Sequence, residues 1–431
     1  MTEGAPAAAP DTVWDGDQSV PTSLPLLDAY LEERAAGARP LEGMAALLIQ
    51  HQLGSIVPMT RALIALGLSP KRLFWVDIPY TANETVKGEL LALGIPARNF
   101  AASSYHLEMP YASYQRRRVQ QMALRLRRLV SWNEPMLVMD DGAYFLEAVS
   151  CFAGSPGELR IVEQTTRGII KINADMSLRD CCESVTVLNV AQSAPKKNIE
   201  GPLIGQAVCH ALLAKLHDRE RDVRGSPCLV IGFGQIGRGV AAALVEQLGV
   251  PPSRIHVLEL SEQACADAAA QGYVVWGRAF PERRRFGLVV GCSGTTSFNT
   301  GDRVFLEDGA VLASASSGSS ELSREAFIEL ADTHGRDHIF VHDRGSLRSR
   351  SIHSDLWVRL VDRDVCFLNG GFPVNFDGAV NCVPPRFIQA THALQVGAAV
   401  EAVRTTSRGL VDVSDDLCRW VERRFAELVG H

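Results

Sequence analysis

A glycine-rich turn between an apolar run and an amphipathic stretch most constrains what this chain can fold into. The turn reads Gly232-Phe233-Gly234-Gln235-Ile236-Gly237 and follows the apolar run Cys228–Ile231. A helical pattern continues to Leu248, and Glu259 ends the next strand-like run, Ile255–Leu258. A strand, a glycine turn, a helix and an acidic residue in this order are typical of a Rossmann unit. A turn that only joins a strand to a helix is the less favoured interpretation.

This pattern predicts a dinucleotide site with defined contacts. Glycines permit a tight turn and close backbone approach, so a pyrophosphate can lie against the helix N-terminus with its free N–H groups. Glu259 would accept hydrogen bonds from the adenosine ribose and repel a 2′-phosphate, which favours NAD over NADP. The cofactor contacts predicted here are Gly232, Gly234, Gln235, Ile236, Gly237 and Glu259.

Other strand-like runs complete the two predicted units. In the second half we expect strands at 273–276, 287–291, 310–315 and 338–341, which gives a six-stranded Rossmann count. In the first half we expect helical structure over 24–52, helices at 59–66, 83–93 and 114–130, strands at 72–78 and 135–140, and a strand or turn at 99–104. Amphipathic helices are expected at 387–402 and 415–429. Alternating strands and helices imply parallel sheets with helices on both faces.

The predicted fold class is therefore α/β, with a Rossmann NAD-binding domain inserted into a second doubly wound α/β domain that binds substrate. The predicted divisions are a disordered leader at 1–23, a substrate domain at 24–204, the NAD domain at 205–372, and C-terminal helices at 373–431 that return to the substrate domain.

Composition narrows the function classes. The chain has 431 residues, 46% hydrophobic and 21% charged, with a net charge of −6, which argues against general nucleic-acid binding. No apolar run is long enough to span a bilayer. The leader has neither the basic nor the apolar region of a secretion signal. The 10 cysteines form no CxxC and no zinc-site spacing with histidine. We therefore expect a cytoplasmic protein with reduced thiols and no bound metal.

Further motifs resemble a known family from about His51 to Ala402. They are His51 before a helix ending Ala65-Leu66-Gly67, then Asp77-Ile78-Pro79-Tyr80-Thr81, Met139-Asp140-Asp141-Gly142, Val162-Glu163-Gln164-Thr165-Thr166-Arg167-Gly168, and Asn189-Val190 through Lys196 to Glu200. With the glycine turn and Asn369, the chain resembles a divergent S-adenosylhomocysteine hydrolase. The Glu-Gln-Thr-Thr-x-Gly stretch is the most specific element.

The resemblance implies a mechanism in which tightly held NAD oxidises a ribose 3′-hydroxyl, the 5′ substituent is eliminated, water adds, and the hydride returns. Lys196 matches a lysine near the 3′ oxygen, where a neutral amine could take the hydroxyl proton. Glu200 matches an aspartate four residues on, and the two would share one helix face. His51 and Asp141 match an acid–base pair near the 5′ leaving group. Taken singly, Lys196 could be a surface lysine, His51 a helix cap and Asp141 a turn residue.

The resemblance also assigns residues to the two ligands. Thr165, Thr166, Ser293, Gly318 and Asn369 match cofactor contacts. The substrate pocket departs from the family pattern. Its implied residues are Gln164 in place of a glutamate, Ser55 in place of a glutamate, Phe372 in place of a histidine, and Thr81. Leu53 and Ser319 also depart, and the family's Lys/Tyr C-terminal tail is missing.

Three functions stay open on these residues. The favoured one is NAD-dependent oxidation of a nucleoside-like or other polyhydroxyl substrate, with or without elimination and hydrolysis. The second is true adenosylhomocysteine hydrolysis with a rebuilt pocket, and the third is a non-catalytic NAD-holding regulator. The expected partners are a small-molecule substrate and, by resemblance, other copies of the chain in a dimer or tetramer. No nucleic acid or membrane is expected.

Overall fold

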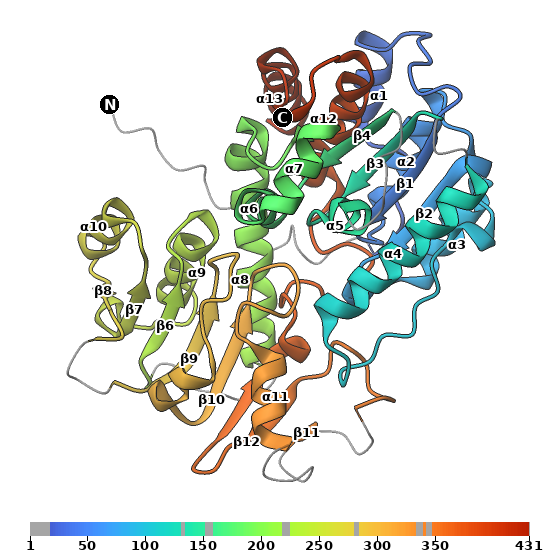
Figure 1. Ribbon diagram of the computed structural model, residues 1–431. Helices are drawn as coiled ribbons and strands as arrows, with labels where there is room; N and C mark the ends of the chain where they lie inside the picture. Colours follow the sequence, from blue (N-terminus) through green and yellow to red (C-terminus); the bar gives the residue numbers. More distant parts are fainter. Residues whose placement is uncertain are drawn as a thin grey trace.

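Two parallel-rich sheets, each covered by helices, make up the molecule (Figure 1). The computed structural model describes residues 18–130, 134–150, 158–217, 225–279, 284–332, 339–341 and 347–430. Most of the predicted leader, residues 1–17, lies outside these ranges. Its last part is not a free leader, because the Gln18 side chain accepts a hydrogen bond from the Val380 amide at 2.9 Å. The predicted α/β class is confirmed.

The first sheet has the strand order β14-β5-β4-β3-β1-β2 within the described residues, and every neighbouring pair is parallel. Its strands are β1 (Ala45–Gln50), β2 (Leu73–Asp77), β3 (Met136–Asp140), β4 (Leu159–Glu163), β5 (Thr186–Asn189) and β14 (Gly409–Asp412). Strand β14 comes from the C-terminal region, so the chain leaves this sheet after β5 and returns to it near its end.

Helices bury both faces of this sheet, because alternate residues of each strand point to opposite sides. One face packs on α1 (Pro25–Glu33), α2 (Ile56–Ala65), α3 (Glu84–Ala92), α12 (Pro385–Arg404) and α13 (Asp415–Val429). The other packs on α4 (Tyr111–Leu129), α5 (Tyr144–Ser150), α6 (Thr166–Ala174) and α7 (Met176–Ser184). Figure 1 shows α12 and α13 beside α1, from the other end of the chain.

The prediction of helical structure over 24–52 is wrong in its second half. The α-helix in this range is α1, in the first half, and Ala45–Gln50 in the second half is the buried strand β1. All six residues of β1 are buried, so the run is apolar on both sides. A short, continuous apolar run shows neither the alternation of a half-buried strand nor the period of an amphipathic helix. Its sequence pattern therefore cannot distinguish a strand that is buried on both faces from a buried helix. The predicted element at 99–104 reduces to a single bridge between Trp75 and Phe100.

The second sheet has the strand order β11-β12-β13-β10-β9-β6-β7-β8 among the residues described. Its strands are β6 (Cys228–Ile231), β7 (Ile255–Leu258), β8 (Val274–Val275), β9 (Phe286–Gly291), β10 (Leu306–Ser314), β11 (Ile339–Val341), β12 (Leu356–Arg359) and β13 (Asp364–Phe367). Six parallel strands lie in the order β8-β7-β6-β9-β10-β13 across the sheet. When they are numbered by their order along the chain, this reads 3-2-1-4-5-6, the strand order of a Rossmann fold.

The sixth Rossmann strand is not the one the sequence predicts. The run at 338–341 contributes β11, which pairs antiparallel with β12 at the edge of the sheet. The sixth parallel strand is instead β13, which pairs with β10. The run Asp364–Phe367 is short and lies close to β12, so it gives no separate strand signal in the sequence. Helices α8 (Gly201–His217), α9 (Gln235–Glu246), α10 (Glu262–Ala270) and α11 (Arg324–Asp332) accompany this sheet.

Candidate functional site

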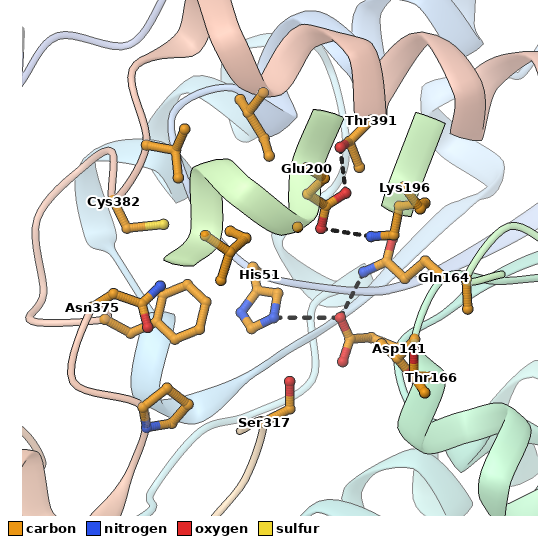
Figure 2. Close-up of a pocket in the computed structure, with 18 of the residues that line it drawn as sticks. His51, Asp141, Gln164, Thr166, Lys196, Glu200, Ser317, Asn375, Cys382 and Thr391 are labelled. Carbon is orange, nitrogen blue, oxygen red and sulfur yellow. Dashed lines mark hydrogen bonds and ion pairs between the residues drawn. The ribbon is translucent and has the colours of Figure 1, made fainter. Parts of the chain in front are cut away.

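A cavity of about 420 Å3 is lined by residues of both sheet units and of the chain segment that returns from the second sheet to the first. Figure 2 shows how its polar side chains point toward one another. Ten of the residues predicted from the sequence line this cavity: His51, Ser55, Asp141, Gln164, Thr165, Thr166, Lys196, Glu200, Ile236 and Ser293.

Strand ends explain why the first-unit residues meet. His51 follows β1, Asp141 follows β3 and Gln164 follows β4, and these three parallel strands are neighbours in the sheet. Their carboxyl ends therefore open on the same edge, which is where ligands bind in open α/β sheets.

His51, Asp141 and Gln164 form a connected chain. The Nε2 atom of His51 lies 3.3 Å from Oδ2 of Asp141. The same oxygen accepts a hydrogen bond of 2.6 Å from Nε2 of Gln164. Burial raises the pKa of Asp141, but nearby His51, Gln164 and Lys196 outweigh it, and the net pKa lies below the usual range. Asp141 is therefore a stable carboxylate on the cavity wall.

Thr81 lies behind His51 and does not line the cavity. Its Oγ1 donates to the Ile78 carbonyl at 3.0 Å and also contacts Nδ1 of His51 at 3.1 Å. This arrangement fixes the ring orientation and leaves Nε2 as the atom that faces Asp141 and the cavity. Phe376 stacks on the His51 ring, with centroids 4.7 Å apart.

Lys196 and Glu200 form a second pair on a π-helical segment, Lys196–Glu200, that continues into α8. Nζ of Lys196 lies 2.6 Å from Oε1 of Glu200, and both side chains are largely buried. The other carboxylate oxygen of Glu200 accepts a hydrogen bond from Thr391 of α12. One turn of unusual helix thus holds an amine and a carboxylate together beside the cavity, and such π-turns are frequent at functional sites.

The predicted glycine turn has no room for a side chain at two of its glycines and open space at a third. Gly232 has φ +86, and a Cβ at Gly237 would lie 1.9 Å from the Gly232 carbonyl oxygen, so neither position accepts a side chain. A Cβ at Gly234, in contrast, would meet nothing within 4 Å. Backbone atoms therefore pack closely against Gly232 and Gly237, whereas the space beside Gly234, the N-cap of α9, is open.

Glu259 is held against the same turn. Its carboxylate accepts hydrogen bonds from the backbone amides of Phe233 and Leu260, each at 2.6 Å, and of Ser261 at 2.9 Å. Partial burial raises the pKa of Glu259, and these hydrogen bonds bring the net pKa below its usual value. A charged carboxylate therefore stands beside the second strand of the Rossmann unit.

Several other predicted residues lie outside the cavity lining: Thr81, Gly232, Gly234, Gln235, Gly237, Glu259, Gly318, Asn369 and Phe372. Phe372 is fully buried and stacks on Tyr80, with centroids 4.9 Å apart. Asn369, with φ +52, donates through Nδ2 to the carbonyls of Pro373 and Phe376 and so shapes the returning segment. The Gly318 amide donates to the Tyr80 hydroxyl at 3.2 Å.

The polar or aromatic residues of the cavity that the sequence prediction missed include Asn375, Phe376, Cys382, Thr391, His392 and Gln395. Three of them lie on α12, whose sequence Phe387–Ala402 is otherwise mostly apolar. Polar side chains in such a buried helix need partners, and this is a signal that could have found them. The loop residues Asn375 and Cys382 carry no comparable signal.

Glu163 was also missed as a support of the site. It is fully buried at the end of β4, and its carboxylate accepts hydrogen bonds from the amides of Gly142, Ala143 and Thr165 and from the Thr165 hydroxyl. It thereby fixes the loop that follows Asp141 to the loop that follows Gln164.

Among the described residues, no helix is both long and apolar enough to cross a membrane. In that same part of the chain, no group of three or more His, Cys, Asp or Glu side chains is arranged to hold a metal ion.

Sequence relatives are distant. The chain is 26% identical over 393 residues to uncharacterized proteins of two Mycobacterium tuberculosis strains, CDC 1551 and H37Rv. The match covers 91% of this chain and 69% of each relative. No protein-family model matches the chain.

Three solved structures show weak likeness. The A chain of dipicolinate synthase from Bacillus subtilis has a TM-score of 0.33 and 10% sequence identity, over 63% of this chain and 80% of that chain. L-tryptophan dehydrogenase from Nostoc punctiforme has a TM-score of 0.29 and 13% identity, over 67% of this chain and 73% of that chain. Leucine-bound hetero-hexameric glutamate dehydrogenase from Thermus thermophilus has a TM-score of 0.27 and 14% identity, over 91% of this chain and 77% of that chain. None of these relatives or structures is named as an adenosylhomocysteinase. Structural similarity at this level gives no information about the activity of this protein.

Proposed function

We propose that this protein binds NAD at the Gly232–Gly237 turn and uses it to oxidise a secondary hydroxyl of a nucleoside-like substrate. The observation that carries the proposal is the convergence of two acid–base pairs on one cavity. Lys196 with Glu200 and His51 with Asp141 line it together with Ile236, the second residue of the helix that opens the Rossmann unit.

The residues of the turn fit a dinucleotide. The first N–H groups of an α-helix have no partner within the helix and attract anions. At the N-terminus of α9 the open space beside Gly234 gives a diphosphate close access to them. The Glu259 carboxylate accepts three hydrogen bonds, one from the turn at Phe233 and two from the amides of Leu260 and Ser261. A carboxylate has about four acceptor positions, so one is left for a ribose hydroxyl. Its charge opposes a 2′-phosphate, which supports NAD over NADP.

NAD, when bound, accepts the hydride released as a secondary hydroxyl becomes a ketone. The hydroxyl proton must leave at the same time, and Lys196 with Glu200 is suited to receive it. The amine can hydrogen-bond the substrate oxygen while the carboxylate 2.6 Å away shares the proton. Thr391 holds the second oxygen of Glu200 and so keeps the pair in place.

His51 and Asp141 are suited to proton transfer at a second position of the substrate. His51 Nε2 faces the cavity side of Asp141, and Thr81 sets the orientation of the ring. Such a pair can remove a proton next to a carbonyl or protonate a leaving group, as the resemblance to adenosylhomocysteine hydrolases implies. Elimination and hydrolysis are therefore part of the proposal, with a substrate pocket that differs from that family's.

One assay separates the open functions. Purified protein is incubated with NAD and a panel of ribonucleosides that includes adenosylhomocysteine, while the NADH absorbance band and released homocysteine are followed. Absorbance growth without homocysteine indicates oxidation, and homocysteine release indicates hydrolysis. Bound NAD that no substrate reduces, with no release, contradicts the proposal and supports a non-catalytic NAD-binding protein.

A further inference from the structure

Arg167 brings a cation into the cavity from the first turn of α6. Its side chain is partly buried and lines the cavity. Nη1 donates a hydrogen bond of 2.7 Å to the Ser317 carbonyl, in the loop that follows β10 of the second unit. A Cβ at Gly318 would lie 2.2 Å from the same Nη1, so this loop fits closely around the guanidinium. The side chain is therefore held in one place between the two units.

Arg167 forms no ion pair with a carboxylate in the part of the chain that the structure describes. Besides burial, the groups that act most on its charge are the phenols of Tyr144, Tyr111 and Tyr80. Burial raises the pKa of each phenol, so all three are neutral and none balances the positive charge. Asp141 also acts on the guanidinium, but without forming an ion pair with it. A partly buried cation without a counter-ion costs free energy, which an anionic ligand would recover.

The other charged side chains of the cavity lining do not share this property. Lys196 is paired with Glu200 at 2.6 Å. Lys197 is exposed, so solvent and salt screen its charge. The Asp141 carboxylate already has two partners of its own. Among the described residues that line the cavity, the uncompensated positive charge is therefore located at Arg167.

The remaining donors of this guanidinium suit a carboxylate or a phosphate. A guanidinium holds several N–H donors in a planar fork that matches the paired oxygens of these anions. The Ser317 carbonyl uses a donor of Nη1, and within the described ranges Nη2 and Nε of Arg167 donate to no protein group. The hydroxyl of Ser317 lines the same cavity and can donate to the same anion.

The Ser317–Gly318 loop lies at the histidine end of the cavity. The Gly318 amide donates to the Tyr80 hydroxyl at 3.2 Å, and the Tyr80 ring lies 5.8 Å from the His51 ring, measured between centroids. Figure 2 shows the Ser317 side chain directed toward His51 and Asp141. An anion held by this loop would therefore lie next to the acid–base pair of His51 and Asp141.

Resting on the proposed function and deepening it, we propose that Arg167 and Ser317 bind an anionic group of the substrate, a carboxylate or a phosphate, next to the position on which His51 and Asp141 act. The substrate class is then an acidic or phosphorylated derivative of a nucleoside. A neutral nucleoside would leave the guanidinium without a counter-ion.

Adenosine, adenosine 5′-monophosphate and adenosine-5′-carboxylate are the probes, titrated calorimetrically into the protein with excess NAD in solution. They differ at the 5′ position, where the resemblance places His51 and Asp141. We expect both anions to bind at least about tenfold tighter than adenosine. Arg167→Gln removes the charge and should bring the three affinities within about threefold of one another, whereas Arg167→Lys should keep part of the preference.

Two further variants separate binding from structure. Ser317→Ala leaves the backbone carbonyl that holds Arg167 in place and should reduce the preference severalfold. Lys197→Gln removes an equal charge from an exposed position of the same cavity and should change the preference by less than about twofold. Thermal melting shows that each variant is folded.

Tighter binding of only one of the two anions supports the inference and identifies the acid. Equal affinity of the three probes, no binding of any, or a preference that persists in both Arg167→Gln and Ser317→Ala overturns it. An anion that displaces NAD also overturns it, because Arg167 would then belong to the dinucleotide site.

NADH formation is followed on the same preparation, so that the two proposals can fail separately. If a neutral polyol reduces NAD while the anions bind no tighter than adenosine, the inference fails and the proposed function stands. If the anions bind tighter through Arg167 while no substrate reduces NAD, the proposed function fails alone.

Discussion

Glu200 joins the π-helical segment to α12 through its two carboxylate oxygens, one 2.6 Å from Nζ of Lys196 and the other accepting from Thr391. The nearest basic neighbour in sequence, Lys197, also lines the cavity but is exposed. Two adjacent lysines therefore differ in burial and partner, which makes them a matched pair for mutation.

We expect Lys196→Met to reduce substrate-driven NADH formation by about 100-fold or more, because the hydroxyl proton loses its acceptor pair. NAD affinity should stay within about twofold of the wild-type value. Lys197→Met should change the rate by less than about threefold. Single-turnover absorbance kinetics provide the measurement. Equal losses in the two variants would remove Lys196 from the proposed mechanism.

Thr81→Val should lower kcat by about tenfold with little change in KM, because outer-shell partners of a functional histidine orient its ring. Thr81 touches His51 and not the cavity, so substrate binding itself should be preserved. Thr81→Ser keeps the hydroxyl and should restore most of kcat. A Thr81→Val change confined to KM would instead make Thr81 a substrate contact.

Two glycines of the same turn should respond in opposite ways to alanine. Gly237→Ala should destabilise the fold, because its Cβ would lie 1.9 Å from the Gly232 carbonyl oxygen. Gly234→Ala has open space and should melt near the wild-type temperature, yet weaken NAD binding by about tenfold or more by blocking the diphosphate. Calorimetric titration and thermal melting measure both. Unchanged NAD affinity in Gly234→Ala would place the dinucleotide elsewhere.

His392 predicts a pH dependence of stability. Its pKa falls from 6.5 to about 4 on burial, so between these values the unfolded chain binds a proton that the folded chain does not. Stability should therefore fall by about 3 kcal/mol as pH drops from 6.5 to 4. Glu200 and Lys196 are the charged groups that act on this ring.

Urea unfolding across this pH range tests that loss. His392→Gln should remove most of this pH slope, whereas His210→Gln, at an exposed position of α8, should keep it. An equal slope in His392→Gln would mean that other groups cause the acid sensitivity.

The sequence predicted those parts of the fold in which local pattern and tertiary environment agree. Strand β6, the glycine turn, α9 and β7 lie within a residue or two of the expected bounds, because turn chemistry and periodicity coincide there. Strand β1 was missed because both its sides are buried. Strand β13 was missed because its parallel partner, β10, is distant in sequence, with Ala310 paired to Val365, 55 residues later. Long-range pairing of this kind leaves no local signal.

The candidate site was predictable where it follows strand ends. His51, Asp141 and Gln164 each come directly after a parallel strand, and the structure brings them together. Asn375 and Cys382 could not be found in the same way, since their place depends on how the returning segment folds over the β1–α2 loop. Thr81 and Asn369 were predicted from motifs as ligand contacts, but neither lines the cavity. Thr81 contacts His51, and Asn369 donates a hydrogen bond to the Pro373 carbonyl.

The most direct test of the account is mass spectrometry of the small molecules released when the purified protein is denatured, combined with titration of NAD into protein stripped of ligand. The account predicts NAD or NADH at near one molecule per chain, or tight binding on titration, with at least about tenfold weaker binding in Gly234→Ala. Protein that releases no dinucleotide and binds none at millimolar NAD would contradict it.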